Sequence, residues 1–204
     1  MDLKLLHISD THGVHRRLRD LPEADILVHS GDFTMSGSEA ETLDFLEWLC
    51  DLPYRHKVLV AGNHDVCFYG ALLNGLDDNV LYLCGSGVDI VGLKFWGVPM
   101  FMEDCISGKQ EQLYAAIPED IDVLVTHTPP YGILDRDGSI LYGSRVLLER
   151  VSTIRPCLHL FGHIHKAHGM TNDGMTVFSN AAIMDEGYDS LNGPNMLPIS
   201  APEH

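Results

Sequence analysis

The sequence is poor in basic residues. Its 204 residues include 13 Lys and Arg against 29 Asp and Glu, which gives a formal net charge of −16 with His counted as neutral. A broad surface for DNA or RNA needs clustered Lys and Arg, so this balance excludes an extended nucleic-acid interface. If the substrate carries phosphate, bound divalent cations are the natural source of attraction, because they are often the largest local charges in a site.

Long hydrophobic runs and targeting signals are lacking as well. No stretch approaches the roughly 18 uninterrupted apolar residues of a membrane span, and residues 1–9 hold one Lys and too short an apolar run for a signal peptide. The five cysteines include no C-x-x-C pair, and their odd number indicates reduced, mostly buried thiols. We therefore expect a cytoplasmic protein with no membrane partner.

The apolar residues, 45% of the chain, are enough for one sizeable core. Without repeats, linkers or low-complexity tracts, residues 1–204 are predicted to form one α/β domain. Short apolar runs predict strands at 3–8, 25–29, 57–61, 80–83, 88–91, 93–96, 121–125, 157–161 and 175–178. Several of these runs are continuously apolar, which is typical of strands in a sheet that helices cover on both faces.

Three segments have helical character. The clearest is 38–50, where Ser38 and Glu41 form a capping-box pattern and Leu43, Leu46 and Leu49 follow at helical spacing. Segments 110–116 and 144–151 are shorter candidates. Residues 85–87 and 172–174 lie between predicted strands and are interpreted as hairpin turns.

Metal-ligand types of residue follow five of the predicted strands. The blocks are Ser9-Asp10-Thr11-His12-Gly13, Ser30-Gly31-Asp32, Ala61-Gly62-Asn63-His64-Asp65, Thr126-His127-Thr128 and Phe161-Gly162-His163-Ile164-His165. In open α/β sheets, sites gather beyond the carboxyl ends of strands, so these side chains should converge. The Gly before several ligands permits tight turns and close backbone approach.

The residue types point to a particular chemistry. Carboxylate, amide oxygen and imidazole together suit Mn, Fe, Zn or Co better than Ca, which prefers oxygen alone. The candidate ligands are too many for one small divalent ion but suit two: Asp10, His12, Asp32, Asn63, His127, His163 and His165. Two ions about 3.5–4 Å apart can clamp a phosphate, generate hydroxide and stabilise the leaving oxygen.

At these residues the chain resembles the calcineurin-like metallophosphoesterase superfamily, whose ordered signature is D-x-H, G-D, G-N-H-D/E, H and G-H-x-H. All five blocks are present between residues 10 and 165. The resemblance implies a four-layer αββα sandwich of two mixed sheets flanked by helices.

The resemblance also implies a dinuclear metal centre. One ion is expected on Asp10, His12, Asp32 and His165, and a second on Asp32, Asn63, His127 and His163, with Asp32 bridging. Mn²⁺ is favoured, with Fe, Zn, Co and Mg as alternatives. His64 is expected to contact the phosphoryl oxygen or protonate the leaving group without binding metal, and Asp65 is expected to orient it.

Sequence around His127 and His163 is similar to the small single-domain branch that contains the metallophosphoesterase-domain proteins of animals. That branch implies a phosphodiesterase, with cyclic nucleotides among its substrates and a metal-bridging hydroxide as nucleophile. Two alternatives stay open: a phosphomonoesterase or nucleotide pyrophosphohydrolase with the same metals, and a metal- or nucleotide-binding regulatory protein with vestigial activity. The expected partner is in each case a small phosphate ester or nucleotide.

Some histidines are expected to be structural, and one residue departs from the sequence pattern of the branch. His29 and His159 lie inside apolar strands and are interpreted as core histidines, and His7 receives a structural or surface role. Lys166 stands where the branch leads us to expect an acidic residue, so the rim of the pocket is expected to differ there.

Overall fold

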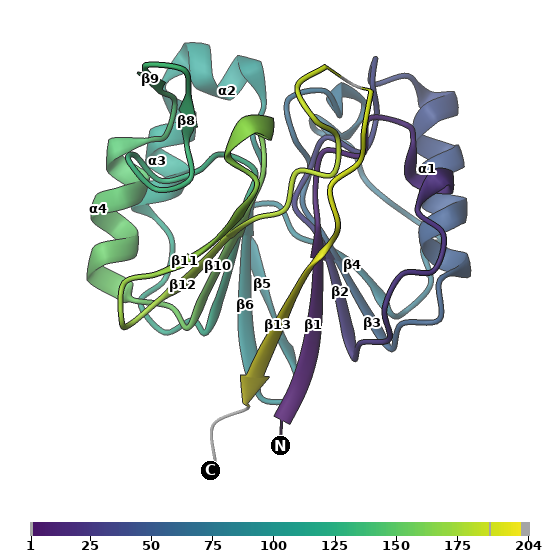
Figure 1. The fold of residues 1–204 in the computed structure, drawn as a ribbon, viewed down its shortest axis with the longest axis horizontal. Helices are drawn as coiled ribbons and strands as arrows, with labels where there is room; N and C mark the ends of the chain where they lie inside the picture. The colour runs from purple at the N-terminus through teal and green to yellow at the C-terminus, as the bar shows by residue number, and fades with distance from the viewer. Residues whose placement is uncertain (1, 188, 201–204) are drawn as a thin grey trace.

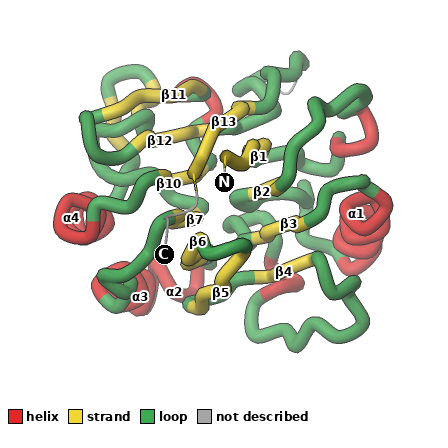
Figure 2. Tube along the Cα trace, turned by 90° about the horizontal axis from the view of Figure 1, so that it is seen from below, coloured by secondary structure: helices red, strands yellow, loops and turns green. Residues whose placement is uncertain are grey.

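The computed structural model describes residues 2–187 and 189–200 and shows two β-sheets packed face to face with helices outside each sheet. Figure 1 shows the four layers: α1 covers one sheet, α3 and α4 cover the other, and the strands fill the middle. The view from below in Figure 2 shows the strands in two rows between these helices. The expected αββα sandwich is thus confirmed.

The first sheet has the strand order β13-β1-β2-β3-β4. Strands β1 to β4 run parallel to their neighbours and β13 runs antiparallel to β1. The bounds are β1 (Asp2–Ile8), β2 (Ile26–His29), β3 (His56–Leu59), β4 (Val80–Tyr82) and β13 (Asn195–Ser200).

The second sheet has the order β11-β12-β10-β7-β6-β5, with antiparallel strands only at its two edges. Its strands are β5 (Ser86–Ile90), β6 (Leu93–Val98), β7 (Val123–Thr126), β10 (Leu158–Phe161), β11 (Gly169–Asn172) and β12 (Val177–Asn180). A separate small hairpin is formed by β8 (Arg136–Asp137) and β9 (Ile140–Leu141).

The helices are α1 (Glu39–Asp51), α2 (Met102–Ser107), α3 (Lys109–Ala115) and α4 (Arg145–Ile154), with short 3₁₀ turns η1 (His15–Arg17), η2 (Val66–Phe68) and η3 (His165–Ala167). Ser38 caps α1 with the complete capping box to Glu41 that the sequence predicted. No helix within the described residues is long and apolar enough to cross a membrane.

Alternation along each strand builds three apolar layers. Leu5 of β1 and Val125 of β7 lie in the core between the two sheets. Their neighbours point the other way: Leu6 packs in the layer under α1, and Leu124 packs in the layer under α3 and α4. Because side chains alternate with a period of two, strands buried on both faces have continuous apolar sequence, as expected.

The structure corrects two predictions, one about the apolar face of α1 and one about the turn at residues 85–87. Leu43 is 59% exposed, and α1 instead buries Phe45, Trp48 and Leu49. Residues 85–87 do not make a hairpin, because β4 and β5 belong to different sheets, so this segment carries the chain from one sheet to the other. The turn at 172–174 does join the antiparallel pair β11 and β12, as predicted.

The cysteines differ from expectation, and one edge strand was not among those predicted. All five cysteines are free, but Cys67, Cys84 and Cys157 are exposed and the other two are only half-buried, so the prediction of mostly buried thiols was wrong. Strand β13 was not predicted, because Pro198 interrupts its pattern. Pro198 lies on an edge strand, where proline is tolerated.

Candidate metal centre

The structure gathers the candidate ligands at the carboxyl ends of the parallel strands. The residues come from the loops after β1 (Asp10, His12), β2 (Asp32), β3 (Asn63, His64), β7 (His127) and β10 (His163, His165). The two sheets are joined here by backbone hydrogen bonds, among them Met184 N to Asp10 O (3.2 Å) and Met100 N to Ala61 O (3.1 Å). Parallel β-structure thus collects residues from both halves of the chain at one place.

One cluster contains Asp10, His12 and His165, whose ligand atoms all lie within 4.8 Å of one another. The Nε2 atoms of His12 and His165 are 3.2 Å apart, and His165 Nε2 is 3.4 Å from Asp10 Oδ1. Asp10 is completely buried, and its carboxylate accepts hydrogen bonds from the backbone N–H of His163. A buried carboxylate and two imidazoles therefore face one small volume.

The hydrogen bonds of the two rings show which nitrogens face that volume. His12 Nδ1 lies 3.2 Å from the carbonyl oxygen of Thr34, and His165 Nδ1 lies 3.3 Å from that of Asp185. A carbonyl only accepts, so each Nδ1 donates to its carbonyl, and Nε2 is the nitrogen of each ring that faces the cluster. Two imidazole nitrogens and a buried carboxylate thus converge on one small volume, an arrangement that fits a metal ion held as the residue types predict.

The second cluster contains Asp32, His127 and His163, again within 4.8 Å. His127 Nε2 is 3.2 Å from Asp32 Oδ2 and 3.2 Å from Asn63 Oδ1. His127 Nδ1 is 2.9 Å from the carbonyl oxygen of Ser30, so its Nε2 is likewise the nitrogen that faces the cluster. Nitrogen and oxygen atoms that can bind a metal ion therefore converge here as they do in the first cluster.

Asp32 links the two clusters: it belongs to the second, and it forms a further group with His12 of the first cluster and His64. Its Oδ2 is 3.9 Å from His12 Nε2 and 3.2 Å from His127 Nε2, while its Oδ1 accepts a 2.8 Å hydrogen bond from the backbone N–H of His64. A nitrogen of His64 also lies within 4.8 Å of ligand atoms of His12 and Asp32. This position fits the bridging place expected of Asp32.

The pKa values describe the same convergence of acceptors. Burial disfavours a charged His127, but the Asp32 carboxylate outweighs burial and raises the pKa of His127 to about 9. Burial would raise the pKa of Asp10, but its hydrogen bond to His165 and the nearby imidazoles hold that pKa below its usual range. Burial and the nearby His127 both disfavour a positive charge on His163, and together they lower the pKa of His163 to about 4. The site favours positive charge beside Asp32, which a proton or a metal ion can supply.

The glycines before the ligands allow close backbone approach. A Cβ on Gly62 would lie 2.2 Å from Asp32 Oδ1, and a Cβ on Gly162 would lie 2.0 Å from Asp10 Oδ2. A Cβ on Gly31, whose φ is +110°, would lie 2.5 Å from His127 Nδ1. These side-chain-free positions let the loops of different strands meet around the carboxylates, as the sequence indicated.

Four of the candidate ligands have left-handed backbone: Asp10 (φ 53°), His12 (φ 40°), Asp32 (φ 55°) and His163 (φ 70°). This region is strained for residues other than Gly, although Asp and His enter it more readily than most. Such conformations gather at functional sites, where the surrounding structure maintains them. The strain is concentrated where the side chains converge.

The expected role of Asp65 is corrected. Its buried carboxylate accepts hydrogen bonds from the backbone N–H groups of Asp32 (2.8 Å), Thr34 (2.9 Å) and Gly62 (2.8 Å), so it ties the loops after β2 and β3 together. The ring of His64 is held instead by the carbonyl oxygen of Met35, 2.7 Å from Nδ1. The acidic residue that follows His64 in the sequence thus supports the backbone rather than the ring.

Sequence reasoning missed the carbonyl groups that orient the rings. Ser30, Thr34 and Asp185 act through their backbone oxygens, which no side-chain motif records. Asp185 lies in the loop after β12, outside the five blocks, and its own carboxylate bonds to Ser190 and to the backbone of Asp189. Of these three residues, only Ser30 lies within one of the five sequence blocks, directly before Gly31 and Asp32.

The core histidines near the site are structural, as expected. His7 bridges the sheets between Ser179 and Ser30, and His29 bonds Thr11 (3.0 Å). His159 bonds Thr126 (3.0 Å) from β10 to β7. Burial lowers the pKa of His29 and of His159 to about 3, so both rings stay neutral.

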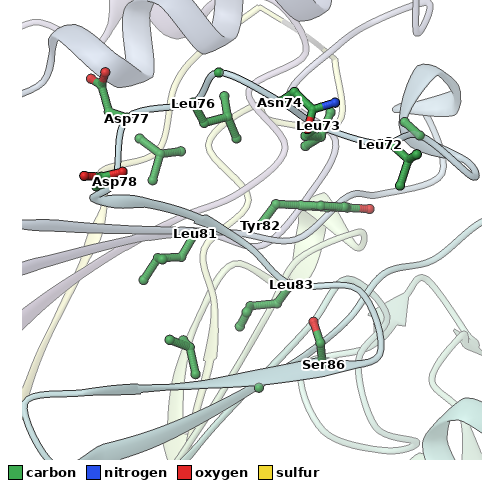
Figure 3. Close-up of a pocket in the computed structure, with 15 residues that line it drawn as sticks. Leu72, Leu73, Asn74, Leu76, Asp77, Asp78, Leu81, Tyr82, Leu83 and Ser86 are labelled. Atoms are coloured by element: carbon green, nitrogen blue, oxygen red, sulfur yellow. The ribbon is translucent and has the colours of Figure 1, made fainter.

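Two cavities differ in whether candidate ligands line them. One of about 250 Å³ adjoins the metal ligands and is lined by Asp137, Tyr142, His163, Ile164, His165, Lys166 and Glu186. A larger one, about 570 Å³, lies between the loop 71–78 and strands β4 and β5 (Figure 3). Figure 3 shows Leu76, Leu81 and Leu83 around that space, and none of the candidate ligands lines it. Of these two cavities, only the smaller one is lined by candidate ligands, His163 and His165.

Comparisons with known proteins show the family of the chain. The chain is 38% identical to the UPF0046 protein K07C11.7 of Caenorhabditis elegans over 91% of this chain and 71% of that protein. It is 31% identical to human metallophosphoesterase domain-containing protein 1 over 97% of this chain and 71% of that protein. A solved structure with 15% sequence identity superposes with a TM-score of 0.61, covering 88% of this chain and 90% of the other. Residues 3–167, which include all the candidate ligands, match the family described as calcineurin-like phosphoesterase, and the chain belongs to that family.

Proposed function

We propose that the protein hydrolyses phosphodiesters, with cyclic nucleotides among the candidate substrates, by means of two divalent metal ions. The observation that carries the proposal is the convergence of metal-ligand atoms in two clusters that Asp32 links, since it belongs to the second and also groups with His12 of the first. Nitrogen and oxygen donors in one site favour Mn²⁺, with Fe, Zn, Co and Mg as alternatives. Membership of a phosphoesterase family makes a phosphoric ester the substrate class.

The residues divide into two ligand sets. Asp10, His12 and His165 would hold one ion, and Asn63, His127 and His163 the other, with Asp32 serving both. When bound, such ions supply Lewis-acid charge for the phosphoryl oxygens and lower the pKa of a water molecule. The chain's own contribution is to hold these ligand atoms at fixed positions, with a carbonyl engaging Nδ1 of His12, His127 and His165.

His64 is the proposed general acid. Its Nδ1 is engaged by the carbonyl of Met35, so the second ring nitrogen is the one that gains and loses a proton. As an imidazolium, His64 can transfer that proton to the departing alkoxide while the P–O bond breaks, and becomes neutral. Its place beside His12 and Asp32 puts it next to both ligand sets.

Charge supports a diester over a monoester. A phosphate monoester carries about −1.5 to −2 charges at pH 7, whereas a diester carries one. The protein has a net charge of −16, and two carboxylates, Asp137 and Glu186, line the cavity beside the ligands. Each additional negative charge on the substrate is therefore unfavourable here.

The test starts from protein stripped of metal and reloaded with Mn²⁺, assayed on bis(p-nitrophenyl) phosphate and on p-nitrophenyl phosphate. We expect metal-dependent cleavage that favours the diester. His64→Asn should lower kcat for a cyclic nucleotide, whose alkoxide leaving group needs a proton, by about 10²–10⁴-fold, while bound metal, measured by elemental analysis, is retained. His56→Asn, at the start of β3 and away from the ligands, is the matched control and should keep full activity.

Other outcomes identify the alternatives. Equal or faster cleavage of the monoester would replace the phosphodiesterase with a phosphomonoesterase or a nucleotide pyrophosphohydrolase. Two bound ions without cleavage of either ester would indicate a metal- or nucleotide-binding regulatory protein.

A further inference from the structure

The cavity beside the ligands has a charged rim, which consists of Asp137, Tyr142, Lys166 and Glu186. Lys166 directly follows His165 and lies in η3. Asp137 lies in β8, Tyr142 follows β9, and Glu186 lies in the loop after β12. None of these residues is a candidate metal ligand.

Lys166 joins the three segments of the rim. Its Nζ lies 2.7 Å from Asp137 Oδ1 and 2.5 Å from Glu186 Oε2. All three side chains are partly exposed, with 45% of Lys166, 34% of Asp137 and 53% of Glu186 accessible. One ammonium group is therefore shared by two carboxylates, which leaves the rim with a net charge of −1.

Tyr142 adds an aromatic surface to the same rim. Its side chain is 49% exposed although the residue lines the cavity. The face of an exposed aromatic ring attracts a cationic group, and it does so most strongly where neighbouring carboxylates have the same preference. The charge of the rim and the ring of Tyr142 thus point independently to a positive or uncharged ligand group.

We propose that this rim selects phosphodiesters whose second ester group is neutral or cationic and disfavours those that carry a further anionic group there. The inference rests on the proposed phosphodiesterase function, since the phosphorus must sit at the ligands and the second ester group in the adjoining cavity. A trimethylammonium or primary ammonium group would lie against Tyr142 and the two carboxylates. A carboxylate or second phosphate would meet like charges.

The test uses three diesters that share the p-nitrophenol leaving group and differ only in the second ester group. These are p-nitrophenyl phosphorylcholine, p-nitrophenyl ethyl phosphate and p-nitrophenyl 2-carboxyethyl phosphate, assayed with Mn²⁺-loaded protein. We expect kcat/KM to fall in that order, by about two- to fivefold for each unit of charge, as is typical of partly exposed ion pairs. The differences should shrink as the salt concentration rises.

Variants of the rim should change the charge preference in opposite directions. Lys166→Gln removes the positive charge and should raise the ratio of kcat/KM for the choline ester over the ethyl ester by about two- to fivefold. Glu186→Gln removes a negative charge and should lower that ratio by a similar factor. Asp137→Asn also removes a negative charge and should lower the ratio in the same way. Glu23→Gln, which removes a charge just before β2 at the opposite end of the sheet, is the control and should leave the ratio unchanged.

The outcomes separate this inference from the proposed function. If wild-type protein cleaves all three diesters equally, or if Lys166→Gln and Glu186→Gln shift the ratio in the same direction, the rim does not select by charge and the phosphodiesterase assignment stands. If none of the diesters is cleaved, the proposed function fails and the inference fails with it. Metal content and Tm of each variant identify any change that comes from lost folding.

Discussion

Gly62→Ala tests whether backbone proximity positions Asp32. A Cβ at residue 62 would lie 2.2 Å from Asp32 Oδ1, 2.5 Å from Asp32 N and 2.8 Å from Asp32 Cγ. The backbone N–H of Gly62 donates to Asp65 Oδ2 over 2.8 Å, so the loop after β3 is held in place on its other side. The shared carboxylate must therefore move away from the new methyl group.

The size of that movement follows from ordinary contact distances. A carbon and an oxygen approach to about 3.3 Å, so Asp32 has to move by about 1 Å. A displacement of that size at a reacting centre can cost about 10²-fold in rate. Crowding of a packed interior typically costs about 1–3 kcal/mol of unfolding free energy, or about 2–12 °C in Tm for a chain of this size.

The assay measures kcat/KM on bis(p-nitrophenyl) phosphate, bound metal and Tm for Gly62→Ala and for Gly193→Ala. Gly193 is the matched control, because a Cβ there meets no atom within 4 Å. We expect Gly62→Ala to lose about 10²-fold in activity and at least one metal ion, and the control to lose neither. A folded Gly62→Ala protein that binds two ions and retains activity within threefold of wild type would refute the reasoning.

Two further predictions concern buried polar groups. Asp65→Asn should destabilise the protein by about 1–3 kcal/mol and weaken metal binding, because an amide cannot accept from all the N–H groups that hydrogen-bond to the Asp65 carboxylate. Urea unfolding tests this. An unchanged unfolding midpoint with only a shifted pH–rate profile would instead support a role of Asp65 in orienting the His64 ring. The second concerns His159, whose pKa of about 3 lies below the value of about 6.5 in an unfolded chain. The unfolded state therefore binds more protons between these values, and stability should fall as the pH falls through this window. His159→Gln should reduce the slope of unfolding free energy against pH between pH 6 and 5 by about 1.4 kcal/mol per unit, and equal slopes in the two proteins would contradict this account.

The core of the fold and the position of the site followed from local patterns. Strands buried on both faces have continuous apolar sequence, and a covered parallel sheet brings the carboxyl ends of its strands together. Asp10 and His165 could therefore be expected to meet across more than 150 residues, and their ligand atoms lie 3.4 Å apart. Strand β13 was missed because Pro198 looks like a strand breaker, and only its place at the sheet edge makes it acceptable.

The details of the site depend on contacts that side-chain motifs do not contain. Asp65 follows His64 directly, and sequence proximity suggested that the two side chains interact. The turn after β3 instead directs Asp65 inward to the backbone of the neighbouring loop, while the ring of His64 turns to Met35. Carbonyl partners such as Thr34 and Asp185 carry no residue-type signal at all, because every residue has a carbonyl group.

The left-handed backbone at the ligands links the residue types to the architecture. Asp10, His12, Asp32 and His163 have positive φ angles, each of which costs about 1–2 kcal/mol for an ordinary L-residue. Asp and His tolerate this region better than β-branched or bulky residues, and they are also the residues that supply oxygen and nitrogen donors. The tight turns let donors from both sheets point into one volume, and the same turns exclude most other residue types. The side chains proposed to bind metal are thus among the few that these loops accept, so a short ordered signature could indicate both the loop conformation and the proposed chemistry.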